Sequence, residues 1–151
     1  MSVSDDEEVV RLLFNPQMID DHGSLIEETC FPTQELVEKN GKSCSVLRSA
    51  LLVNKTIAID LRLQKMANPD KNRLAYGYAE ALCAQIHAIQ DHSGKQIFKV
   101  FEDSILKDGT HDKAHAKLVR ASPKFSKNLV RGYRDKLVEA FSKVNTRNAL
   151  T

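Results

Sequence analysis

The pattern that most constrains the fold is an amphipathic segment near the C-terminus. Five large side chains follow one another there at steps of four residues: Phe125, Leu129, Tyr133, Leu137 and Phe141. This spacing places them on one face of an α-helix. Ser122-Pro123 precedes them, and it offers a capping residue followed by a proline suited to the first helical position. We therefore expect a C-terminal helix that starts near Pro123 and covers a hydrophobic core.

The opposite face of this expected helix carries a basic stripe, made of Lys124, Lys127, Arg131 and Arg134. Cations at this spacing can contact successive phosphates of a nucleic acid without reading its bases. A terminal amphipathic helix must also expose a polar face to water, so a merely solvated face is an open alternative.

The distribution of charge along the chain adds a third interpretation of the stripe. Residues 1–40 hold ten acids and two bases, whereas residues 113–147 hold ten bases and two acids. Such polarity indicates either an anionic partner or pairing between the two ends, within one molecule or between copies as a homo-oligomer.

The first half of the chain shows two further helical patterns. Ser4-Asp5-Asp6-Glu7 matches a capping box, and the apolar residues at 9, 10, 13 and 14 follow at helical spacing until Asn15-Pro16. A short second helix is expected over residues 33–40, with Gly41 as its end. The sequence thus predicts N-terminal helices.

The middle of the chain is ambiguous between helix and strand. Residues 50–66 contain both a strand-like alternation at 57–64 and a helical apolar face, and residues 76–89 are similarly divided. Residues 96–102 form the clearest strand pattern. We expect residues 76–89 to be a strand that pairs with 96–102 across the turn at Asp91–Lys95.

Length and composition favour one globular domain over residues 1–151, with 42% hydrophobic residues available for a core. The expected class is α+β, with a small, mostly antiparallel sheet around residues 76–102 under the C-terminal helix.

No apolar run approaches the roughly 20 residues that span a bilayer. The acidic N-terminus differs from a secretory signal, which predicts a cytoplasmic protein without membrane contact. Its three cysteines include no C-x-x-C pair and are expected to be reduced and buried.

Two pairs of potential metal ligands occur at helical spacing, His111 with His115 and Cys83 with His87. Neither belongs to an HExxH or CxxC pattern, and the glycines form no phosphate-binding loop, so no metal or other cofactor is expected.

A more specific alternative is a metal-free active site like that of a phosphodiesterase. His22 and His115 would act as base and acid, and Arg48 would stabilise negative charge. Ser45 would be a nucleophile only with a base beside it.

The order of several short stretches resembles a group of small bacterial proteins without an established activity. These stretches are DDHGSLIEETCFP, GKSCSVLR, YGYAEAL, KVFEDS and KAHAKLV. The group has a G-x-S-V-x-R step and a late acidic residue followed by a His-Ala pair. Here the glycine-to-arginine step is longer, and Ser104 stands where a proline is expected. The resemblance implies no mechanism, but it independently nominates His22, Arg48 and His115.

The leading prediction is a small non-enzymatic accessory protein whose basic C-terminal helix binds an anionic partner, nucleic acid before an acidic protein surface. The alternatives are the phosphodiesterase-like or nuclease-like enzyme and a protein-binding subunit of a larger assembly.

Overall fold

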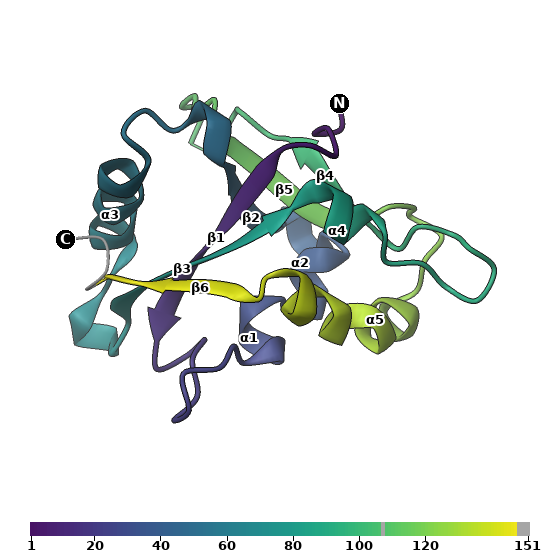
Figure 1. Cartoon of the computed structure of the whole chain (residues 1–151), viewed down its shortest axis with the longest axis horizontal. Coiled ribbons are helices and arrows are strands. Elements are labelled where there is room, and N and C mark those ends of the chain that lie inside the picture. Colours follow the sequence, from purple (N-terminus) through teal and green to yellow (C-terminus); the bar gives the residue numbers. More distant parts are fainter. Residues whose placement is uncertain (107, 148–151) are drawn as a thin grey trace.

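A computed structural model describes residues 1–106 and 108–147. Within these residues, one sheet of six strands has the order β4-β5-β2-β1-β3-β6, with antiparallel neighbours throughout (Figure 1). The strands are β1 (Glu8–Asn15), β2 (Cys44–Arg48), β3 (Leu74–Leu82), β4 (Phe98–Glu102), β5 (His115–Arg120) and β6 (Lys143–Thr146). The predicted α+β class with an antiparallel sheet is confirmed.

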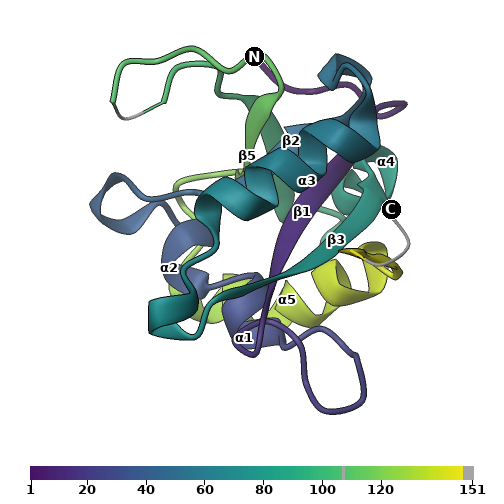
Figure 2. The same ribbon diagram turned by 90° about the vertical axis from the view of Figure 1, so that its left-hand side faces the viewer.

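The helices fill the connections between these strands. They are α1 (Glu27–Cys30), α2 (Thr33–Leu36), α3 (Lys55–Met66), α4 (Cys83–His87) and α5 (Lys127–Ala140), with 3-10 turns η1 (Lys39–Gly41), η2 (Ser49–Leu51) and η3 (Pro69–Lys71). Figure 1 shows α3 and α5 at opposite ends of the molecule. Figure 2 shows α3 in front of β1 and β2, with α5 behind and below them.

The buried side chains form one connected cluster around the central strand β1. Residues 9–14 are all buried there, because other strands flank β1 and packed layers cover both of its faces. Phe31, next to α1, and Phe141, at the end of α5, lie with their ring centroids 5.2 Å apart. This contact joins the N-terminal helices to the C-terminal one.

The predicted helix at the start of the chain is wrong, because β1 occupies that position. Ser4 and Glu7 form a turn, in which the Glu7 N–H donates to the Ser4 carbonyl at 3.1 Å. The apolar run that fits a helical stripe also fits a central strand that is buried on both faces, and its valines favour the strand. The short helix predicted at 33–40 forms as α2 followed by η1.

The two ambiguous segments resolve differently. Residues 55–66 are the helix α3, with Ile59 and Leu63 fully buried, while Ile57 and Leu61 of the competing alternation are 60% exposed. Residues 74–82 are a strand, but residues 83–87 turn into the helix α4.

The predicted pairing of 76–89 with 96–102 is also wrong. Strand β3 lies between β1 and β6, and β4 pairs with β5. Across the expected turn there is one isolated bridge, between Gln90 and Gln96, flanked by backbone hydrogen bonds from the Ile97 N–H to the Ile89 carbonyl and from the Asp91 N–H to the Lys95 carbonyl.

The C-terminal helix is confirmed, but it begins later than predicted. Its cap is Ser126, whose Oγ accepts from the Leu129 N–H at 3.2 Å, and its first residue is Lys127. Ser122 instead accepts from the Lys124 N–H within the preceding turn. After α5 the chain forms β6, which the sequence pattern did not predict.

Candidate functional site

Two polar side chains of neighbouring strands meet on one face of the sheet. In the antiparallel register, Ser45 of β2 faces Lys117 of β5, and Leu47 faces His115. Residues two apart on a strand share a face, so Ser45 and His115 are diagonal neighbours. Their side chains touch, with Ser45 Oγ 3.0 Å from His115 Nε2.

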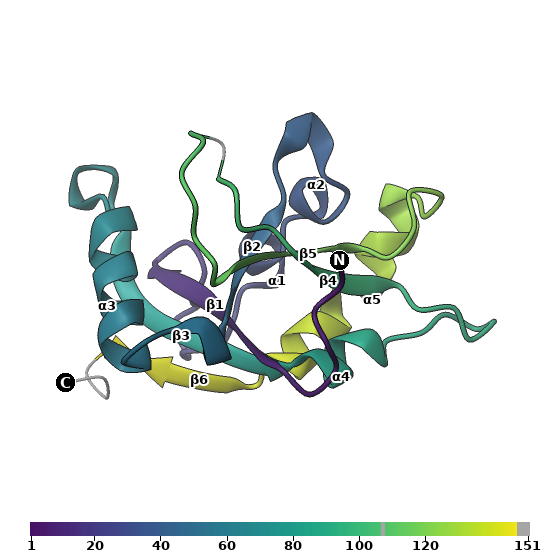
Figure 3. The same ribbon diagram turned by 90° about the horizontal axis from the view of Figure 1, so that it is seen from above.

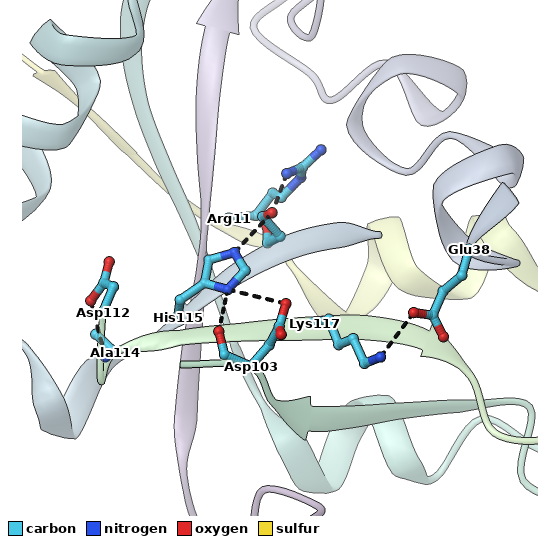
Figure 4. A network of polar contacts seen from close by, with 8 residues as sticks. Arg11, Glu38, Asp103, Asp112, Ala114, His115 and Lys117 are labelled. Atoms are coloured by element: carbon cyan, nitrogen blue, oxygen red, sulfur yellow. Dashed lines mark hydrogen bonds and ion pairs between the residues drawn. The ribbon is translucent and has the colours of Figure 1, made fainter. Parts of the chain in front are cut away.

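The other ring nitrogen of His115 faces Asp103, which follows β4 (Figure 4). His115 Nδ1 lies 2.7 Å from the Asp103 carbonyl oxygen and 3.4 Å from its Oδ2. A carbonyl oxygen can only accept, so Nδ1 carries the proton in this contact. In the neutral imidazole, Nε2 is then an acceptor for the Ser45 hydroxyl, which is the tautomer that a general base requires.

Two cavities open onto this pair. Their volumes are about 510 Å³ and about 420 Å³, and they share Glu35, Ser45, Leu106 and His115 as lining residues. The half-buried Ser45–His115 contact therefore lies where the two cavities adjoin. Figure 3 shows the connection from β4 to β5 rising from the sheet between α3 and α2, and this connection contributes Leu106 and Asp112 to the larger cavity.

The lining of the larger cavity combines apolar side chains with several basic ones. Its cations are Arg11, Arg62, Lys65 and Arg73, and its carboxylates are Glu35 and Asp112. Arg62 Nη2 lies 3.1 Å from Asp112 Oδ1, and Arg11 Nη2 lies 3.7 Å from Glu35 Oε1. After both pairs are counted, the described wall keeps an excess of positive charge, which favours an anionic ligand.

Arg11 holds the strand under Ser45. It is buried in β1, donates from Nε to the Cys30 carbonyl at 2.9 Å, and donates from Nη1 to the Ser45 carbonyl at 2.9 Å. These bonds connect β2 to the last residue of α1, so they fix the backbone that carries the serine. Figure 4 shows the His115 ring between Asp103 and Arg11.

The structure does not bring His22, Arg48 and His115 together. His22 is exposed in the loop between β1 and α1, where its N–H donates to Asp20. Arg48 makes a bidentate contact with Glu7, at 2.9 Å from both nitrogens, and a single contact with Glu102 at 3.1 Å. Its neighbour Leu47 is paired with His115, so the Arg48 and His115 side chains project from opposite faces of the sheet.

The predicted basic stripe loses one of its four members. Arg134 is 7% exposed and pairs through Nε with Glu27 at 3.1 Å and through Nη1 with Thr33 Oγ1 at 2.7 Å. The prediction that Arg134 faces a nucleic acid is therefore wrong, because the helix turns it toward α1 and α2. Arg134 therefore forms an ion pair between the acidic N-terminal and the basic C-terminal part of the same molecule. Lys117 forms another such pair with Glu38, at 2.8 Å.

The remaining basic residues stay on the surface. Lys124 and Arg131 are exposed, and Lys127 is half-buried. The positive charge of Lys39, from η1, lowers the pKa of Lys127, and the charge of Arg131 acts in the same direction. Positive charges from η1 and from α5 therefore lie near the N-terminal end of α5.

Sequence reasoning found His115, and it found Ser45 only on condition of a neighbouring base. It missed Asp103, Arg11 and Arg73. The acidic residue after the 96–102 strand pattern was a usable signal for Asp103, whereas nothing local marks the two arginines.

The other potential metal ligands do not form a metal site in the described part of the chain. His87 Nδ1 lies 2.6 Å from Asp5 Oδ1, and His87 Nε2 accepts from the Val100 N–H. His111 is exposed, and the described residues contain no group of three or more histidine, cysteine or acidic side chains placed to hold a metal ion. No helix in the described residues has the length and apolar character needed to cross a membrane.

Comparisons with known proteins found no similar one: no protein-family model, curated protein or solved structure matches the chain.

Proposed function

We propose that the chain is a serine-dependent hydrolase of small esters, with Ser45 as nucleophile and His115 as general base. The observation that carries this proposal is the 3.0 Å contact between Ser45 Oγ and His115 Nε2 where two cavities adjoin. A hydroxyl becomes a useful nucleophile when a base in hydrogen-bond reach removes its proton and a third group orients that base. Asp103 is the orienting group, acting mainly through its backbone carbonyl.

The proposed reaction has two halves. Ser45 Oγ attacks the ester carbonyl carbon while its proton passes to His115 Nε2, and negative charge develops on the former carbonyl oxygen. The bond to the leaving alcohol then breaks, and Nε2 returns the proton to that alcohol. Water attacks the acyl-Ser45 ester by the same proton route and releases the carboxylic acid. The excess of positive charge in the cavity wall favours the negatively charged intermediate through the general field of the site.

Covalent labelling tests the nucleophile directly. A fluorophosphonate probe should add one adduct to the wild-type chain, detected by intact mass, and Ser45→Ala should abolish it. Ser43→Ala is the matched control, because Ser43 also lines the smaller cavity and should leave the adduct in place.

Turnover of p-nitrophenyl butyrate tests the base. His115→Ala should lower kcat by roughly 10²- to 10⁴-fold, the contribution of a positioned general base. Adduct formation that persists in Ser45→Ala, or turnover unchanged in His115→Ala, would contradict the proposal.

A second candidate function is binding of a nucleic acid at the basic end of α5, by Lys39, Lys127 and Arg131 with Lys124 beside them. The observation that favours it is the exposure of Lys39, Lys124 and Arg131, together with the charge of Lys39 acting on Lys127, whose pKa it lowers. This surface replaces the predicted stripe, and it requires no enzyme.

Fluorescence anisotropy with mixed DNA and RNA at about 50 and 200 mM salt tests this surface, because phosphate-driven binding weakens by orders of magnitude between them. Reversal of Lys39, Lys127 and Arg131 to Glu should abolish binding, while His115→Ala should not change it. Binding that survives the triple reversal would exclude the surface.

A further inference from the structure

Arg73 is held rigidly at the edge of the larger cavity. Its backbone forms a two-way bridge with Asn68, donating at 2.9 Å and accepting at 2.8 Å. Its guanidinium lies over the Phe14 ring, 3.8 Å from the centroid. Arginine stacks well on aromatic faces and keeps its N–H groups directed outward in the plane. The side chain is therefore ordered before any ligand arrives.

This guanidinium differs from the other two arginines that line the same cavity. Arg11 and Arg62 each contact a carboxylate. Among residues 1–106 and 108–147, no carboxylate pairs with Arg73 and no protein acceptor bonds its guanidinium. Burial lowers the pKa of Arg73, and the nearby Arg11 charge lowers it further, with Glu35 acting in the opposite direction. A half-buried cation without an anion is electrostatically costly, and a bound carboxylate or phosphate would relieve that cost.

Arg73 and Ser45 line the same cavity, so a ligand that contacts both must be elongated. Arg11 contacts the Ser45 carbonyl, and Phe14 lies under Arg73. The Cα atoms of these two β1 residues are separated by roughly 10 Å along the strand, so Arg73 and Ser45 contact different parts of the cavity wall. The lining of this cavity also includes the apolar side chains of Leu12, Met18 and Met66. A ligand spanning it needs a hydrocarbon body.

We infer that Arg73 binds a terminal anionic group of the substrate, so that the enzyme acts on esters with an apolar chain and a distal carboxylate or phosphate. Lys65, exposed at the rim of the same cavity, adds positive charge without a fixed geometry. The claim that the bound molecule is a substrate rests on the proposed hydrolase. The anion site itself does not depend on Ser45. It assigns Arg73 to binding and specificity.

The test compares two esters that differ only at the far end, p-nitrophenyl octanoate and mono-p-nitrophenyl suberate. Wild type should prefer the suberate ester in kcat/KM. Arg73→Gln should lower kcat/KM for it by roughly 10- to 100-fold, the effect of a lost charge-assisted contact, and should change octanoate turnover by less than about threefold. Arg73→Lys should give an intermediate loss, and Lys136→Gln, which removes one exposed charge on α5, should change neither ester.

Binding of unreactive ligands separates this inference from the proposed function. Suberate and octyl phosphate are titrated calorimetrically into Ser45→Ala and into Ser45→Ala with Arg73→Gln, after thermal melts verify folding. Binding that depends on Arg73 supports the anion site even if neither ester is hydrolysed, and the stronger ligand identifies the preferred anion. Equal turnover of both esters, unchanged by Arg73→Gln, would overturn the inference and leave the hydrolase intact. Absence of binding by either anion would also overturn it.

Discussion

At the scale of single residues, the contacts of His115 decide what the candidate site can do. One ring nitrogen meets a backbone carbonyl and the other a hydroxyl, so the contact with Asp103 assigns the tautomer. The carboxylate of Asp103 is the more distant of its two contacts, at 3.4 Å. The backbone therefore does most of the orienting.

A substitution at Asp103 should consequently be mild. Asp103→Asn keeps the backbone carbonyl that holds the ring, so kcat for ester hydrolysis should fall by no more than about tenfold with little change in KM. His115→Ala should cost far more, within the range for a lost general base. Steady-state kinetics of both variants measure the difference. A loss in Asp103→Asn as large as in His115→Ala would show that the carboxylate is the essential contact.

The cysteines are expected to be inert in the folded protein. Burial raises the pKa of Cys30 and Cys44 to about 11 and that of Cys83 to about 12, although Arg11 partly offsets the first two. The thiolate is the reactive form, so a disulfide reagent at pH 8 should titrate almost no thiol before unfolding and three after it. Rapid reaction of one thiol in the folded state would contradict this.

At the scale of elements, Gly77 allows β6 to dock against β3. A Cβ atom at this position would lie 2.0 Å from the Asn145 carbonyl oxygen, a backbone atom that moves only if β6 moves. Gly77 is paired with Thr146 in the same ladder. Close approach of the two strands therefore requires a residue without a side chain.

Two glycine substitutions should have opposite effects. Gly77→Ala should destabilise the protein by about 1–3 kcal/mol and expose β6 amides to hydrogen exchange, because the strands must separate. Gly132→Ala, in α5 with open space around it, should stabilise by about 0.5–1 kcal/mol. Denaturant unfolding and hydrogen exchange measure both. A neutral Gly77→Ala would mean that β6 contributes little to the fold.

At the scale of the whole molecule, Glu80 links segments that are far apart in the sequence. Its carboxylate lies 3.0 Å from Lys55 of α3 and 3.6 Å from Lys143 of β6, and it is almost fully buried in β3. Burial alone would raise the pKa of Glu80, but the hydrogen bond and charge of Lys55, with the charge of Lys143, hold it below the ordinary value.

This ion pair predicts a pH-dependent contribution to stability. Because the folded pKa is depressed, the contribution is present above the unfolded value near 4.3 and is lost as the pH falls through the folded pKa. Glu80→Gln should lower the free energy of unfolding by about 1–3 kcal/mol at pH 7. The difference from wild type should shrink below about pH 4. Glu139→Gln, at an exposed pair on α5, should change stability little at either pH.

The sequence by itself determined the features that depend on local periodicity and composition. The C-terminal amphipathic helix, the strand near 98–102, the α+β class and the buried thiols all follow from patterns within a few residues. It left two segments undecided, and it assigned a helix to β1, because an apolar run is ambiguous until the number of its packed faces is known.

Only the tertiary structure decided which strands pair and which side chains meet. Ser45 and His115 are 70 positions apart, and their side chains touch because of the register in which β2 and β5 pair. The side chain of Arg48, only three residues from Ser45, projects from the opposite face of the sheet. Arg134 fits the basic stripe by spacing, yet it turns inward because Glu27 and Thr33 lie beside it in space. Contacts of this kind depend on long-range packing, for which a single sequence carries no local signal.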